Sequence, residues 1–231
     1  MAKMKKLFAI FLTLCLIFNF STIAFASPAE KRENPVASAD FKKVCDQVFQ
    51  GKGEVYNASG VDITNSFLTR YNEIYQSGNY NAILYGCFEE GVSQLTGHKN
   101  IVPDVTDRAV LHPQYEESAV HLVTQKGFPY DGKSWYLTVT ATGSYGYQDS
   151  TNEIIDFPSP TISVSFSDLG ALFSGSLDSV RTTRPIVNSS KTSASFSVTT
   201  THTVSCPIPG VDNVTGTLGP FTNVSNFTVE V

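Results

Sequence analysis

The stretch KTSASFSVTTTHTVSC, residues 191–206, alternates between two kinds of side chain. From position 193 to position 205 every odd residue is serine or threonine, whereas the even residues read Ala, Phe, Val, Thr, His and Val. Because successive side chains of a β-strand point to opposite faces of its sheet, this period of two predicts a strand with one hydroxyl-bearing face and one largely apolar face. We interpret the hydroxyl-bearing face as the solvated side of an antiparallel sheet.

The same two-faced pattern recurs upstream, in WYLTVTATGSYGY (135–147) and TISVSFS (161–167). Turn-forming residues separate the segments, and no convincing helix lies between them. The candidate strands are 119–125, 135–147, 161–167, 171–187, 193–205, 215–218 and 223–231. Many strands with short connections and no helical crossovers predict an antiparallel β-sandwich over residues 119–231.

The segment before these strands has a helical period instead. In ADFKKVCDQVFQG (39–51) the apolar residues follow the spacing i, i+3, i+4, i+7, with Ser38 placed to cap the helix and Gly51 to end it. Segments 65–78 and 80–97 repeat this spacing, and a small hairpin turning at 57–60 is expected between the first two helices. The prediction is an α+β fold, mainly β, with a helical subdomain (39–98) and a linker (99–118) before the sandwich. We expect the helices to pack on one end or edge of it.

The first 26 residues predict a secretory signal peptide. Three lysines precede the apolar run 7–18, and Ala24-Phe25-Ala26 matches the small-x-small pattern of a cleavage site. The apolar run is shorter than the roughly 20 residues that a spanning helix needs, which argues against a retained anchor. Residues 27–38 are polar and lack periodicity, so they predict a disordered leader. The expected location is therefore extracellular.

The charge of the chain argues against nucleic acid as a partner. The formal net charge is −5, and loss of the three leader lysines would make it −8. Nonspecific nucleic-acid binding depends on clustered Lys and Arg. The densest basic spots are the pair Lys42-Lys43 and the residues Arg181 and Arg184, and neither forms a patch.

Three cysteines follow the predicted cleavage site, namely Cys45, Cys87 and Cys206. In an oxidising compartment this odd number allows one disulfide and one remaining thiol. Cys45 and Cys87 both lie on the apolar side of expected helices, so they are the predicted disulfide pair. The alternative is that all three are buried small apolar residues with free thiols.

The sequence contains no recognisable catalytic or metal-binding motif. Its four histidines lack ligand spacing, and Cys-x-x-Cys, Gly-x-Ser-x-Gly and phosphate-loop patterns are missing. Loop oxygens in DSTNEIID (149–156) offer a calcium site, although the EF-hand pattern is lacking. No catalytic residue, metal or cofactor is therefore predicted. A hydrolase would need two carboxylates, for which the candidates are Glu89-Glu90, Glu116-Glu117 and the pair Glu153 and Asp156.

Aromatic residues gather around the candidate strand 135–147. Trp135 shares the parity of Leu137 and Val139 and is expected in the core, which leaves Tyr136 as the better surface residue. Exposed tyrosines suit stacking on sugar rings. The predicted ligand-binding residues are Tyr130, Tyr136, Tyr145 and Tyr147, with a glycan or another cell-envelope component as the partner.

These patterns together favour a secreted, non-catalytic binding protein. The first alternative is a membrane-active β-hairpin, since the 13 residues from 193 to 205 exceed the about 10 that a membrane strand requires. Arg181 and Arg184 argue against it, because their odd separation places one of them on the lipid face, where arginine costs roughly 2–4 kcal/mol at the bilayer midplane. The second alternative is an extracellular hydrolase.

Overall fold

The computed structural model describes residues 36–101, 110–125, 134–168, 174–208 and 214–231. Contacts group Asn34–Val231 into one compact unit. The predicted signal peptide and Tyr130 lie outside the described residues. The helices are α2 (Ala39–Phe49), α3 (Thr64–Gln76) and α4 (Tyr80–Glu89). The strands are β1 (Val55–Asn57), β2 (Val92–Ile101), β3 (Gln114–Thr124), β4 (Ser134–Ser144), β5 (Gly146–Gln148), β6 (Glu153–Asp156), β7 (Thr161–Asp168), β8 (Ser174–Thr182), β9 (Ile186–Val187), β10 (Ser193–Pro207) and β11 (Thr215–Glu230).

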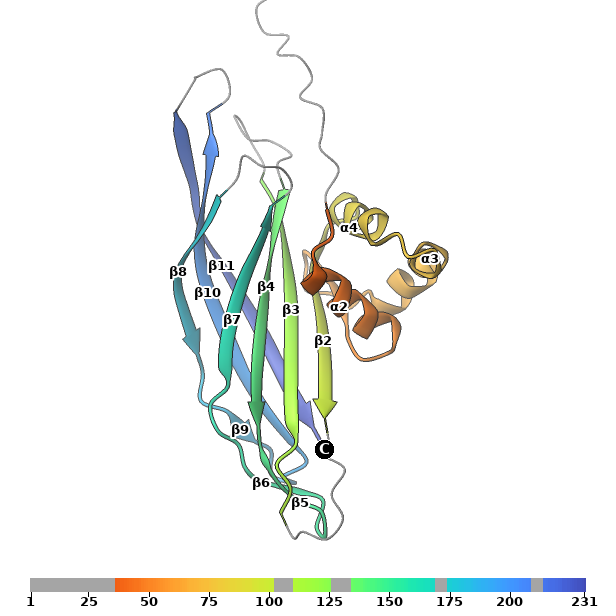
Figure 1. Ribbon diagram of the computed structural model, residues 1–231, viewed down its shortest axis with the longest axis vertical. Coiled ribbons are helices and arrows are strands. Elements are labelled where there is room, and N and C mark those ends of the chain that lie inside the picture. The colour runs from red at the N-terminus through yellow and green to blue at the C-terminus, as the bar shows by residue number, and fades with distance from the viewer. Residues whose placement is uncertain (1–35, 102–109, 126–133, 169–173, 209–213) are drawn as a thin grey trace, which may run out of the picture. The chain divides into compact units, whose positions relative to one another are not determined.

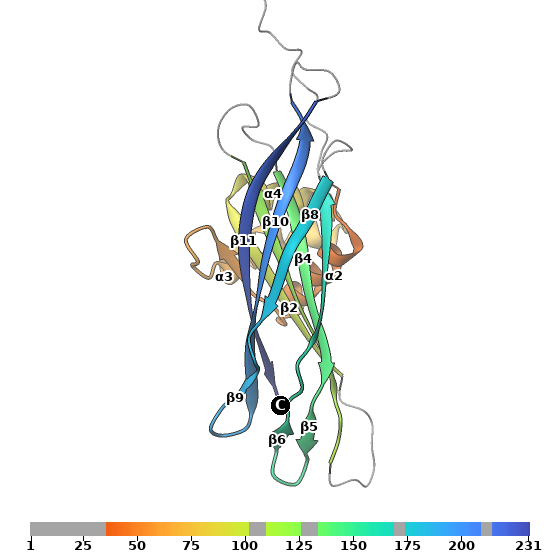
Figure 2. The same cartoon turned by 90° about the vertical axis from the view of Figure 1, so that its left-hand side faces the viewer.

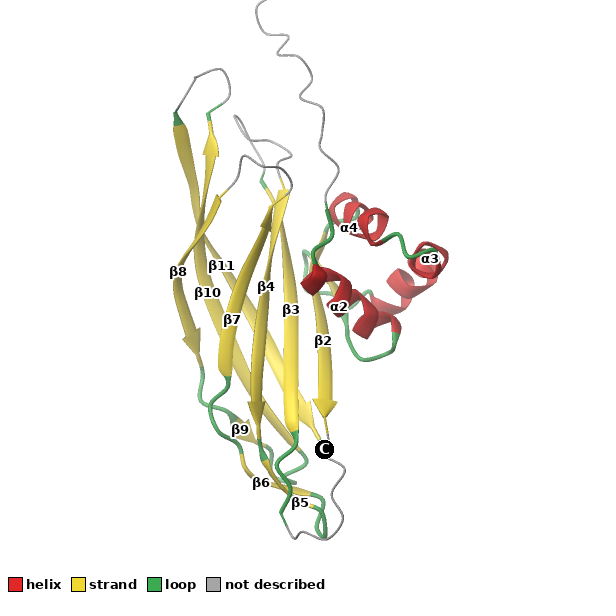
Figure 3. Cartoon of the chain, in the orientation of Figure 1, coloured by secondary structure: helices red, strands yellow, loops and turns green. Residues whose placement is uncertain are grey.

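The described elements form an α+β fold that is mainly β, as the sequence predicts. The three helices lie in the N-terminal part of the chain, with the short strand β1 between α2 and α3, and the other strands follow. Figure 3 shows the helices grouped on one side of the strands, and every strand pairing among the described residues is antiparallel. A five-stranded sheet has the order β1-β2-β3-β4-β7, and a four-stranded sheet has the order β11-β10-β8 with β9 beside β10. The helices lie on one side of the five-stranded sheet and the four-stranded sheet lies on its other side (Figures 1 and 2).

Strand β10 has the two faces that its sequence predicts. Ala194, Phe196 and Val198 are buried between the two sheets, whereas the serines and threonines of the other face are exposed or half-buried. Hydroxyls of that face bond across strands: Ser195 Oγ lies 3.1 Å from Thr228 Oγ1 on β11. The hydroxyl-bearing face is therefore the solvent side of the four-stranded sheet. The apolar face, which a membrane-active hairpin would offer to lipid, packs against the five-stranded sheet instead.

The first part of β4 is buried on both faces, which corrects the prediction for Tyr136, whereas Thr142 and Ser144 near the end of the strand are exposed. Its odd residues, such as Leu137 and Val139, face the four-stranded sheet, while Tyr136 faces the helices and is fully buried. The Tyr136 hydroxyl accepts a hydrogen bond from the Ser38 N–H (2.8 Å) and donates one to the Val36 carbonyl (3.2 Å). The helices thus cover a face of the five-stranded sheet, rather than the end or edge of a sandwich that we expected.

The core under the helices contains Cys45 and Cys87 as free thiols, which corrects the predicted disulfide. Burial, and to a lesser degree Asp46, raises the pKa of Cys45 to about 12. Burial also raises the pKa of Cys87. A buried free cysteine packs as a small apolar side chain, so the core accommodates both thiols without a bond. Cys206 is likewise buried and free.

The segment after α4 departs most from the predicted elements. The third helix was expected to run through Leu95, but α4 ends at Glu89 and residues 92–101 form β2. Gly91 ends the helix with a positive φ of 70°, a conformation that glycine adopts without strain. Strand β3 then begins at Gln114, inside the predicted linker 99–118. The strand β2 pairs with both β1 and β3, so it lies within the five-stranded sheet.

Candidate functional site

An open groove of about 940 Å³ runs between β2 and the edge strand β11. Strand β11 packs over β3, as the contacts between these two strands show, and β11 has no partner strand on its outer side among the described residues. The four-stranded sheet therefore stops short of β2 and leaves the inner face of β2 uncovered. The groove is lined by Glu54, Tyr56, Asn57, Ala58, Gly60, Ser93, Gln94, Thr96, Gly97, His98, Asn100, Glu117, Asn226, Phe227, Thr228 and Glu230.

The floor of the groove is the polar inner face of β2. Gln94, Thr96 and His98 alternate along this face, and they oppose His121, Ala119 and Glu117 of β3 in the antiparallel register. Residues that oppose each other in a register point to the same face of the sheet. The amide, hydroxyl and imidazole groups of β2 therefore share one surface with the Glu117 carboxyl.

One wall of the groove is the free backbone edge of β11. The Val231 N–H donates to the Thr192 carbonyl beside β10, so the odd residues of β11 turn their backbone groups towards β10. Asn226, Thr228 and Glu230 consequently direct their N–H and C=O groups outwards, to the groove. The Asn100 side chain donates to one of them, the Glu230 carbonyl, at 2.7 Å.

The opposite wall comes from the turn that follows β1. Asn57 Oδ1 accepts hydrogen bonds from the N–H groups of Ser59 (2.9 Å) and Val61 (3.0 Å), which shapes the turn predicted at 57–60. The Tyr56 hydroxyl donates to Glu54 Oε2. This hydrogen bond is the main cause that raises the pKa of Tyr56 to about 12, so Tyr56 stays neutral in the groove.

Glu117 is the most unusual group of the groove. It is only 5% exposed, and it forms no side-chain hydrogen bond or ion pair with any described residue. Its neighbour Glu116, whose side chain lies on the other face of β3, pairs with Lys43. Burial, and secondarily the charge of Glu116, raises the pKa of Glu117 to about 9. At neutral pH this carboxyl is therefore protonated, and it can both donate and accept hydrogen bonds.

A buried polar cluster behind the groove joins the two sheets. His121 Nε2 on β3 and Ser225 Oγ on β11 share a hydrogen bond of 2.7 Å. Trp135 Nε1 donates to His202 Nε2 at 3.3 Å. Burial, with a smaller contribution from His202, lowers the pKa of His121 to about 4, so this imidazole is neutral. The cluster positions β11 over β3 and thereby sets the wall of the groove.

No protein-family model, curated protein or solved structure matches this chain. What the groove binds is therefore inferred from its own lining. In the part of the chain that the structure describes, no helix is long and apolar enough to cross a membrane. Nor do the described residues contain a group of three His, Cys, Asp or Glu side chains that could hold a metal ion.

The predicted tyrosine site is not assembled by the structure. Tyr136 lies in the core under the helices and Tyr145 in the core between the sheets, and both are buried. Tyr147 is half-buried, and its hydroxyl donates to Asn152 Oδ1 at 2.5 Å. Tyr130 falls outside the described residues. Tyr136 on β4 and Tyr145 just after it pack in two separate cores, and Tyr147 on β5 is half-buried, so these three tyrosines form no common surface.

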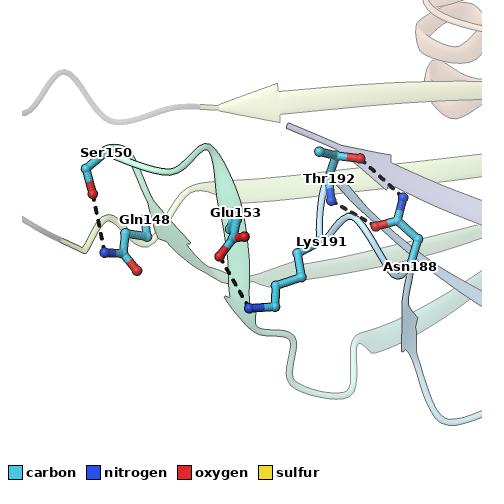
Figure 4. A network of polar contacts seen from close by, with 6 residues as sticks. All are labelled: Gln148, Ser150, Glu153, Asn188, Lys191 and Thr192. Carbon is cyan, nitrogen blue, oxygen red and sulfur yellow. Dashed lines mark hydrogen bonds and ion pairs between the residues drawn. The ribbon is translucent and has the colours of Figure 1, made fainter.

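The loop considered for calcium is part of a hydrogen-bonded network (Figure 4). Residues 149–152 form a turn that leads into β6, where Glu153 Oε2 pairs with Lys191 Nζ at 3.3 Å. Gln148 Nε2 donates to Ser150 Oγ at 3.3 Å. The Asn188 side chain accepts from the Thr192 N–H at 2.8 Å. The carboxylate of Glu153 is thus engaged by a lysine in the same network.

The sequence analysis does not predict the groove residues, because the sequence of β2 lacks the pattern of a strand. The segment VSQLTGHKNI has apolar residues only at Val92, Leu95 and Ile101, and its first part fits a helical spacing. The even positions 94, 96, 98 and 100 are polar, but Ser93 and Lys99 at odd positions are polar as well, so the alternation typical of a strand is incomplete. The sequence offers Glu116-Glu117 as a candidate carboxylate pair. Adjacent residues of a strand point to opposite faces, but this rule does not predict how buried each carboxyl is.

Proposed function

We propose that this chain is a secreted, non-catalytic binding protein that holds a neutral, extended oligosaccharide of the cell envelope in the groove between β2 and β11. The polar lining of the groove is the single observation that carries the proposal. The signal-peptide pattern of residues 1–26 supports export.

The lining suits a ligand rich in hydroxyl groups. Asn, Gln and carboxyl side chains each offer several hydrogen-bonding positions, and Gln94, Asn57 and Glu117 lie at different places around the groove. The half-buried ring of Tyr56 adds a flat surface on which a sugar ring can stack. The volume of about 940 Å³ lies at the upper end of the range for ligand sites, in keeping with an oligomer.

The charge of the lining favours a neutral ligand over an anionic one. Among the described residues no lysine or arginine lines the groove, whereas Glu54 and Glu230 do. An anion would meet carboxylates without a compensating cation, and the chain as a whole carries a net charge of −5. Nucleic acids and anionic polysaccharides are therefore not the proposed ligands.

Calorimetric titration with chitohexaose and cellohexaose tests this function. We expect one of them to bind, and Gln94→Ala, which removes a floor amide, to weaken that binding about tenfold through the loss of hydrogen bonds worth roughly 1–1.5 kcal/mol. The control is Ser176→Ala, an exposed residue of β8 that does not line the groove, with unchanged affinity. Absence of binding by both hexaoses, or equal affinity of the two variants, would contradict the proposal.

A further inference from the structure

Glu117 combines three properties that ordinary surface carboxyls lack. It lines the groove, it is 5% exposed, and it has no hydrogen-bond or ionic partner among the described residues. Its carboxyl oxygens are not among the fully enclosed side-chain atoms that lack a partner, so the carboxyl reaches the open space of the groove. Glu117 therefore offers hydrogen-bonding positions to a ligand in the groove.

We propose that Glu117 is the specificity-determining residue of the groove, where its neutral carboxyl donates a hydrogen bond to an acceptor oxygen of the bound oligosaccharide. This inference rests on the proposed function, because it assigns a role within the same groove. An ionised carboxylate only accepts hydrogen bonds, whereas a neutral carboxyl also donates one. Loss of the proton would leave two acceptors facing each other.

The surroundings of Glu117 keep it neutral. His98 opposes it on β2 and Ala141 opposes it on β4, while Tyr115 neighbours it on β3. Glu54 lines the groove from the β1 side, and Glu230 lines it from β11. On the other face of β3, the charge of Lys43 is already paired with Glu116. No lysine or arginine lines the described part of the groove, and burial, with a smaller contribution from Glu116, raises the pKa of Glu117 to about 9.

Keeping this proton lowers the stability of the fold at neutral pH. The unfolded chain would ionise Glu117 near its ordinary pKa of 4.5, and the folded chain does not. Groups with such perturbed pKa values gather at functional sites, where activity is retained at the expense of stability. A glutamine at this position would be neutral at every pH, yet would still offer a donor and an acceptor.

Binding of the tighter hexaose at pH 7 and pH 10 tests the inference. We expect the wild-type affinity to fall about tenfold at pH 10, one unit above the Glu117 pKa of about 9. Glu117→Gln should bind at pH 7 and keep its affinity at pH 10. Glu117→Ala should bind about tenfold more weakly at pH 7, because the donor is gone. Circular dichroism at both pH values confirms that each variant is folded.

The outcomes separate this inference from the proposed function. Wild-type binding that Glu117→Ala leaves unchanged would overturn the inference and keep the function. A carbon-13 titration of the Glu117 carboxyl, assigned with Glu117→Gln, should give a midpoint near 9, and a midpoint near 4.5 would overturn the inference whether or not a glycan binds. Release of reducing ends that Glu117→Gln abolishes would also overturn it, by making Glu117 a general acid. Failure of both hexaoses to bind would remove the function and this inference with it.

Discussion

His121 on β3 and Ser225 on β11 share a hydrogen bond of 2.7 Å across the space between the two sheets. Both side chains are buried, and the residues are 104 positions apart in the chain. This contact ties the edge strand of one sheet to the middle of the other, and it lies behind the wall of the groove. The arrangement makes the hydrogen bond important for stability and for the position of β11.

Removal of the Ser225 hydroxyl is expected to lower the free energy of unfolding. Ser225→Ala leaves the buried His121 without its partner, which costs about 1–3 kcal/mol for an unsatisfied buried polar group. Urea denaturation at pH 7 measures the loss. Ser195→Ala on the solvent face is the control, and we expect it to change stability by less than about 0.5 kcal/mol. Equal stability of the two variants would show that the hydrogen bond contributes little.

The stability contributed by a neutral His121 should be lost in acid. Its folded-state pKa is lowered from 6.5 to about 4, so the unfolded chain takes up a proton first as the pH falls. The stability is complete above pH 6.5 and declines through the window down to pH 4, by about 3 kcal/mol in total. His121→Gln lacks this titration. The free energy of unfolding is measured for wild type and His121→Gln from pH 7.5 to 4. We expect the wild type to lose stability relative to His121→Gln as the pH falls, and a constant difference between the two would refute the lowered pKa.

Glu117 should give the opposite pH dependence. Because its folded-state pKa is raised from 4.5 to about 9, its contribution to stability is complete below pH 4.5 and is lost as the pH rises towards 9. Glu117→Gln removes this loss, so we expect it to raise the free energy of unfolding by about 3 kcal/mol at pH 7 and to have little effect at pH 4. Urea denaturation at the two pH values measures both differences. A variant less stable than wild type at pH 7 would contradict a neutral, unpartnered carboxyl.

Tyr136 should behave as a core residue and not as a ligand-binding one. Tyr136→Phe removes the hydrogen bonds to the Ser38 N–H and the Val36 carbonyl, which we expect to cost about 1–2 kcal/mol of stability. Binding of the hexaose should be unchanged. Tyr147→Phe serves as the matched control with little effect on stability, because among the described residues the Tyr147 hydroxyl bonds to Asn152, on an exposed turn. Weaker ligand binding by a folded Tyr136→Phe variant would contradict this expectation and support Tyr136 as a ligand-binding residue.

The thiols should be unreactive in the folded protein. Cys45, Cys87 and Cys206 are buried. The raised pKa values of Cys45 and Cys87 also keep these two residues as thiols, and it is the thiolate that reacts. We expect Ellman's reagent to detect none of them in the native protein and all three in urea, without a reductant. Detection of one thiol in urea would mean that a disulfide joins the other two.

Particular segments show why some elements were predictable. The alternation in β10 reports directly on its local geometry, because period two and burial of one face coincide there. The same rule is wrong for Tyr136 and Thr138 of β4, which are buried, although Thr142 and Ser144 on the same face are exposed as it predicts. A period of two says which residues share a face, but whether a second layer covers the other face depends on distant residues, here the helices 39–89. Strand β2 is not predicted by this rule, because its inner face is polar and lines the groove, so buried apolar residues do not alternate along it.

The sequence by itself determined the α+β class, the helical segments near the N-terminus and the two-faced strands, because these depend on spacings within one segment. Only the tertiary structure decided that the helices cover a sheet face, that Tyr136 is buried, and that the four-stranded sheet ends with β11 packed over β3. Those facts depend on which segments meet across long sequence distances. The groove, with the protonated Glu117 that we propose as its ligand-reading group, arises from the offset between two sheets, an arrangement that no single stretch of the sequence encodes.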